Sequence, residues 1–102
     1  MPDYLVETYL ERRAAHELAQ VARRARVAAE ALTAAGTAVR YLGAIGVVED
    51  EMCFHLYAAP SAAAVTDAAS RAAITVERIM EAVHLGWDRT GLGVGRDASP
   101  PE

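Results

Sequence analysis

The feature that most constrains this chain is a hydrophobic period that switches repeatedly between helical and strand spacing. Residues 11–36 repeat apolar side chains every three or four positions, and residues 62–73 do so over a shorter stretch. Short segments rich in β-branched and aromatic residues flank these helical segments, at 4–10, 39–48, 52–58 and 77–85. The predicted order is strand, helix, strand, strand, helix, strand.

Local signals support the boundaries between these segments. Gly36 is a stop signal for the first helix, and the polar run at residues 49–51 predicts a tight hairpin between two strands. Pro60 ends the third strand, and Ser61 is a favourable N-cap for the second helix.

This order predicts an α+β, ferredoxin-like βαββαβ fold. Two right-handed crossovers place both helices on one face of a four-stranded antiparallel sheet. The length of 102 residues indicates one domain, expected at residues 1–86, and a Gly- and Pro-rich flexible tail at 87–102. We expect the tail to be dispensable for folding. The other sheet face is expected to stay open and to bind a ligand or a second copy, which makes a homodimer.

Composition narrows the classes of partner. The net charge of −4 argues against nucleic-acid binding, which needs a basic surface to displace counterions. No apolar run is long enough to span a bilayer, so no membrane partner is expected. The single cysteine cannot form an internal disulfide, and a cytoplasmic location is therefore expected.

The candidate site centres on Cys53 and His55, which lie two positions apart in the third strand. Side chains alternate along a strand, and the more apolar alternate set is expected to face the helices: Met52, Phe54, Leu56 and Ala58. The opposite set is then expected on the open face, beside residues from the first strand. The predicted patch consists of Glu7, Tyr9, Cys53, His55 and Tyr57.

Two interpretations of this pair remain open. A soft thiolate and an imidazole suit nickel, zinc or copper, and the Glu7 carboxylate can complete a ligand set. In the second interpretation, Cys53 is a half-buried small apolar residue beside a histidine that is hydrogen-bonded to a tyrosine.

The remaining charged residues are given plain structural roles. Arg23, Arg24 and Arg26 lie off the apolar stripe of the first helix and are interpreted as a solvated face. His16 is expected to be solvated, and His84 is expected at the surface end of the last strand.

Three stretches of the sequence resemble a known family. "YLVETYL", "VRYLGAIGVVEDEMCFHLYAAPSAAAV" and "ERIMEAVHL" are similar to small actinobacterial nickel-binding ferredoxin-like proteins, formerly described as a domain of unknown function. The resemblance implies a ferredoxin-like fold, a homodimer and nickel binding, with Glu7, Cys53 and His55 as metal ligands. Some relatives carry further histidines on the second strand and second helix, where this chain has none.

Three functions remain in competition. The first is a cytosolic homodimer that binds a transition metal, of nickel type, at the open sheet face. The second is a cofactor-free enzyme of oxygenase, cyclase or isomerase type, with a cavity at the sheet face. There His55 or Glu7 would be the general acid or base, and Tyr9 and Tyr57 would donate hydrogen bonds. The third is a domain that binds another protein through its sheet, because fold alone does not select a function.

Overall fold

The structure is a computed structural model that describes residues 1–83, and it confirms the predicted order of elements. Within these residues the strands are β1 (Asp3–Tyr9), β2 (Arg40–Val47), β3 (Met52–Ala58) and β4 (Arg78–Ala82). The α-helices are α1 (Leu18–Ala34) and α2 (Ala62–Arg71). Short 3-10 segments at Arg12–Glu17 and Val48–Asp50 precede α1 and β3.

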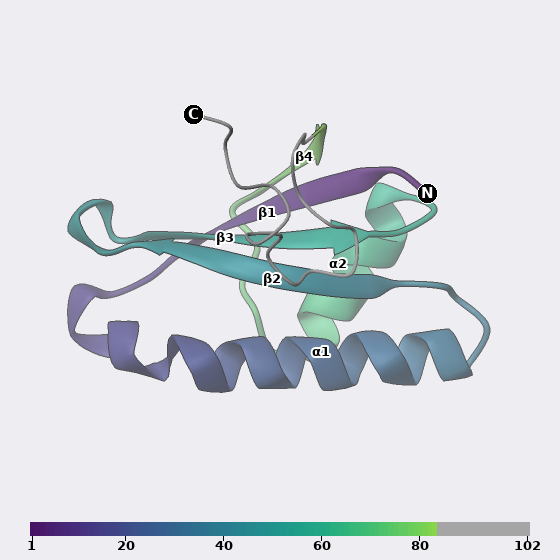
Figure 1. Ribbon diagram of the computed structural model, residues 1–102, viewed down its shortest axis with the longest axis horizontal. Coiled ribbons are helices and arrows are strands. Elements are labelled where there is room, and N and C mark those ends of the chain that lie inside the picture. The colour runs from purple at the N-terminus through teal and green to yellow at the C-terminus, as the bar shows by residue number, and fades with distance from the viewer. Residues whose placement is uncertain (84–102) are drawn as a thin grey trace, which may run out of the picture.

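The strands form one antiparallel sheet in the order β2-β3-β1-β4. Both helices lie on the same face of this sheet (Figure 1). The predicted ferredoxin-like α+β fold is therefore confirmed. The central pairing of β1 with β3 sets Val6 opposite His55 and Thr8 opposite Cys53, so these four side chains share one face.

The boundary signals operate as predicted. The Ser61 side chain accepts a hydrogen bond from the backbone N–H of Ala64 at 3.2 Å, which satisfies one free donor of the first turn of α2. Gly36 has a φ of 111°, a left-handed conformation that favours glycine, just after the end of α1. Glu51 closes the hairpin between β2 and β3 with a φ of 53°.

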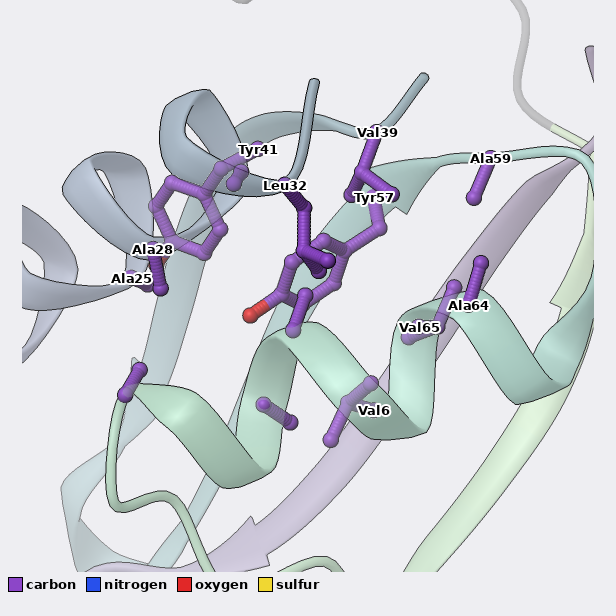
Figure 2. Packing of buried hydrophobic residues seen from close by; sticks show 14 of the residues in the cluster. Val6, Ala25, Ala28, Leu32, Val39, Tyr41, Tyr57, Ala59, Ala64 and Val65 are labelled. Atoms are coloured by element: carbon purple, nitrogen blue, oxygen red, sulfur yellow. The ribbon is translucent and has the colours of Figure 1, made fainter. Parts of the chain in front are cut away.

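The main core lies between the sheet and the helices, and its helix side is mostly alanine. The buried helix residues are Ala25, Ala28, Ala29 and Leu32 of α1 and Ala64, Val65, Ala68 and Ala69 of α2. A methyl group fills little volume, so the sheet supplies the bulk through Tyr41 and Tyr57. Their rings meet edge to face, with centroids 5.2 Å apart. Figure 2 shows both rings among the small side chains of the helices.

The predicted orientation of the third strand was wrong. Cys53, His55 and Tyr57 face the helices instead of the open face, and each is at most 1% exposed. Leu56 and Ala58 lie on the opposite face, in a separate apolar cluster. The prediction sent the more apolar set to the helices. Because the helices contribute mainly alanine, large side chains from the sheet are needed to fill the core. Tyr57 therefore faces the helices.

The first strand follows its predicted alternation. Val6 and Thr8 face the helices, while Glu7 and Tyr9 lie on the other face. Within residues 1–83, no helix has the length and apolar character needed to cross a bilayer. His84 and the tail at residues 87–102 lie outside the described residues.

Candidate functional site

Cys53 and His55 form a close pair on the helix-facing side of β3. Because they are two residues apart on a strand, their side chains project in the same direction. The Cys53 Sγ lies 3.6 Å from His55 Nε2, and the other ring nitrogen, Nδ1, lies 2.7 Å from the Tyr41 hydroxyl. Sulfur, imidazole and phenol therefore form one short chain of contacts.

Two proton arrangements satisfy both contacts. In the first, the Tyr41 O–H donates to Nδ1, and the Nε2–H of His55 donates to the Cys53 sulfur. In the second, the Cys53 S–H donates to Nε2, and the Nδ1–H donates to the Tyr41 oxygen. Only the second leaves a lone pair on Nε2, as a metal ligand or a general base needs.

Burial keeps both members of the pair uncharged. It lowers the pKa of His55 to about 4 and raises the pKa of the Cys53 thiol to about 11, because each charged form loses hydration. Around neutral pH the site holds a neutral imidazole and a thiol. Around neutral pH the pair is therefore better suited to binding a ligand than to exchanging protons.

The Tyr41 side chain holds His55 in place and links it to the core. Its ring packs against Tyr57 on one side, and the Arg26 guanidinium lies 5.6 Å from its ring centroid. Tyr57, by contrast, is completely buried, and within residues 1–83 its hydroxyl has no hydrogen-bond partner. Burial also raises the pKa of Tyr57 to about 12, so this phenol stays protonated.

The pair borders a small pocket on the helix side of the sheet, with a volume of about 200 Å³. The pocket is also lined by Thr8 of β1, by Arg24 of α1 and by residues 73–75, which follow α2. Tyr9 alternates to the other face, but it is the last residue of β1 and borders the pocket where the strand ends. Two hydrogen bonds fix its wall. The Thr8 hydroxyl donates to the Thr75 carbonyl at 2.7 Å, and Arg24 Nε donates to the Ala72 carbonyl at 3.1 Å.

The structure separates Glu7 from the other two expected metal ligands. Glu7 pairs with Phe54 across β1 and β3, so its side chain lies on the sheet face opposite Cys53 and His55. The three residues therefore do not converge. Of the two tyrosines expected beside them, Tyr9 lines the pocket and is 56% exposed, whereas Tyr57 lies in the core.

The Cys53–His55 pair itself fits a soft metal ion. Metal–sulfur and metal–nitrogen bonds of about 2.3 Å and 2.1 Å at a tetrahedral angle place the two donors about 3.6 Å apart. The observed separation of Sγ and Nε2 is 3.6 Å. The Tyr41 oxygen is also where the outer hydrogen bond of a metal-binding histidine is expected. Within residues 1–83, however, no third His, Cys, Asp or Glu joins the pair.

The sequence interpretation missed Tyr41 and Arg24 as neighbours of the pair. The register between β2 and β3 shifts between Tyr41 and Gly43, so alternation counted from the sequence cannot say which face Tyr41 takes. Arg24 was interpreted as solvated, and its bond to the end of α2 is a contact that only helix packing creates. His16 is exposed, as predicted.

Replacing each of the two buried tyrosines by phenylalanine is expected to affect stability differently. Tyr41→Phe leaves the buried Nδ1 of His55 unpaired, and we expect it to lower the free energy of unfolding by about 1–3 kcal/mol. Tyr57→Phe removes a hydroxyl that lacks a protein partner, and we expect a change below about 0.5 kcal/mol or a small gain. Urea unfolding of both variants measures the difference. An equal loss in both would contradict the assigned hydrogen bond.

The lowered pKa of His55 predicts acid sensitivity. The unfolded chain has the ordinary histidine pKa of 6.5 and the folded chain about 4. Between these values the unfolded chain binds more protons, so stability falls as pH falls. From about pH 7 to about pH 4.5 we expect His55 to cost about 2 kcal/mol of unfolding free energy.

The His55→Gln variant isolates this contribution, since glutamine accepts a hydrogen bond but does not titrate. Between about pH 7 and about pH 4.5, its unfolding free energy should fall by about 2 kcal/mol less than that of the wild type. The matched control, His16→Gln, changes an exposed histidine and should keep the wild-type pH dependence. An NMR titration that places the His55 midpoint near 6.5 would contradict the argument.

Comparison with known proteins does not assign this chain to a family. No family model, no curated protein and no solved structure matches it. The resemblance to nickel-binding proteins thus stays a prediction, and function must be argued from the geometry of the Cys53–His55 pair and its surroundings.

Proposed function

We propose that this protein binds a soft transition-metal ion, such as nickel, zinc or copper, through Cys53 and His55 at the helix-side pocket. The supporting observation is the separation of 3.6 Å between a thiol sulfur and an imidazole nitrogen, which suits two ligands of one ion. Thiolate and imidazole prefer such ions over calcium or magnesium. The site differs from the sequence expectation, because Glu7 lies on the other face.

The surroundings of the pair favour binding. Neutral His55 needs no deprotonation above about pH 4, so a metal ion competes with only one proton, that of the Cys53 thiol. The Tyr41 oxygen can accept the Nδ1–H and fix the ring orientation. Donors that complete the coordination come from a molecule in the pocket, since residues 1–83 offer only two.

The same protonation states favour binding over acid–base catalysis. A general acid or base works best when its pKa lies near the operating pH. The pKa values of about 4 for His55 and about 11 for Cys53 lie on either side of neutrality by several units. Glu7, the other expected acid or base, does not share their pocket.

Metal titration of tag-free protein tests this proposal. We expect Cys53→Ser and His55→Ala each to weaken Ni²⁺ and Zn²⁺ binding by more than about tenfold in calorimetry, because each removes one of two protein ligands. Wild-type affinity should rise about tenfold per pH unit near neutrality, as one thiol proton is released.

Glu7→Gln is the matched control and should bind metal like the wild type, because Glu7 lies on the opposite face. Circular dichroism confirms that each variant is folded. Equal affinities in the wild type, Cys53→Ser and His55→Ala would contradict the proposal. A loss in Glu7→Gln alone would return the site to the open face.

We also propose that the protein is a homodimer that pairs through the sheet face opposite the helices. Within residues 1–83 no helix covers this face (Figure 1). It carries an apolar cluster of Leu42, Leu56 and Ala58, with Leu5 packed against it. Ile45, on the same face of the edge strand β2, is 51% exposed. Leu42, Leu56 and Ala58 are themselves only 1–5% exposed, so the apolar surface that this face offers a second copy comes from Ile45 and the half-buried Leu5 and Phe54.

The dimer predicts a specific effect of one exposed residue. Ile45→Asp puts a charge into the proposed interface, and we expect it to weaken dimerisation by at least about tenfold. Val27→Asp is the matched control, because Val27 is equally apolar, is 60% exposed and lies on α1. Light scattering at micromolar concentration measures both. A monomer mass for the wild type, or equal masses for wild type and Ile45→Asp, would contradict the interface.

A further inference from the structure

A groove along the helix layer concentrates positive charge that neither the metal site nor the sheet face uses. It lies between α1 and the end of α2 and has a volume of about 520 Å³. Sites for small molecules commonly fall in the range of about 300–1,000 Å³. The groove is therefore large enough for a small organic ligand.

The groove follows from the unequal lengths and the small side chains of the two helices. α1 has 17 residues and α2 only 10, so much of α1 extends past its neighbour. Along α1 the apolar lining is Val27, Ala28 and Ala31, at the spacing of one helix face. The alanines leave space, and Val27, 60% exposed, adds apolar surface to it.

Arginines surround this apolar lining. Arg23 and Arg24 come from α1 and Arg71 from the last turn of α2, which together are three of the ten basic residues of a chain with a net charge of −4. Among the described residues, no Asp or Glu lines the groove. Even with Asp67, which pairs with Arg71, the three arginines leave a local charge opposite in sign to that of the whole chain.

Within residues 1–83, two of these guanidinium groups are anchored through Nε and keep their other N–H groups for a ligand. Arg24 Nε donates to the Ala72 carbonyl at 3.1 Å, and Arg71 Nε donates to Asp67 Oδ1 at 2.9 Å. Each bond uses one N–H of the five that a guanidinium carries. Anchoring lowers the entropy that an arginine loses when it binds an anion, and the paired N–H groups match a carboxylate.

We propose that this groove binds a small amphipathic anion, a carboxylate attached to an apolar chain. The carboxylate lies against Arg23, Arg24 and Arg71, and the apolar chain covers Val27 and the alanines. The groove is open along one side, but its volume of about 520 Å³ and its short apolar lining match one small molecule, which we take as the occupant in place of a membrane surface.

Decanoate, below its micelle concentration, is the probe. Calorimetry should detect binding to the wild type, and Arg23→Ala and Arg71→Ala should each weaken it by about five- to tenfold. Val27→Asp should weaken it at least tenfold, because it adds a negative charge to the apolar lining. Raised salt should weaken binding to the wild type, since the arginines are exposed.

Controls separate this proposal from general charge effects and from the metal site. Arg13→Ala removes an equally charged, 86% exposed arginine outside the groove and should bind decanoate like the wild type. Arg24 is left unchanged because it lines both pockets. Cys53→Ser should keep decanoate binding whether or not it loses metal.

Three outcomes would overturn the proposal. The first is no binding of decanoate at millimolar concentration. The second is equal binding of decanol, which has no charge and would show apolar contact alone. The third is binding to phosphatidylglycerol vesicles without binding to free decanoate, which would show that the arginines recognise a membrane surface.

Discussion

The rest of the structure depends on one packing constraint: the helices bury little side-chain volume, so the sheet must supply most of the volume of the core. α1 and α2 contribute mainly methyl groups, and Tyr41 and Tyr57 occupy the space between them and the sheet. Their edge-to-face contact brings a phenol hydroxyl close to His55, where it forms a buried hydrogen bond of 2.7 Å. Because polar groups are costly to bury unpaired, this bond also determines where a histidine can sit in the core.

The chemistry of the Cys53–His55 pair follows from that arrangement. The alternation that sends Tyr57 to the helices sends Cys53 and His55 with it, into surroundings that hold both neutral. The imidazole has one nitrogen bonded to a phenol and the other 3.6 Å from a sulfur, a spacing that agrees with the proposed ligand pair. The arrangement also agrees with the plainer interpretation, a buried cysteine beside a histidine bonded to a tyrosine. Metal titration distinguishes the two.

Separate surfaces give this small domain room for more than one contact. The sheet face carries the exposed Ile45 beside the buried cluster of Leu42, Leu56 and Ala58, and the helix layer carries the arginine groove. The Cys53–His55 pair lies between these surfaces, on the helix side of β3. Because Arg24 lines both the groove and the pocket, a ligand in one can affect the other through this single side chain.

The sequence by itself determined the order of elements, the Ser61 cap, the hairpin at residues 49–51 and the alternation of β1, because these depend on local periodicity and turn chemistry. It also identified Cys53 and His55 as neighbours, since residues two apart on a strand share a face. Only the tertiary structure decided which face that is. Both alternate sets of β3 are apolar enough to be buried, and the choice was made by the volume that alanine-rich helices leave empty. Whether Tyr41 and Glu7 lie beside the Cys53–His55 pair depended on cross-strand register and on that same choice of face. No local pattern in the sequence contains either.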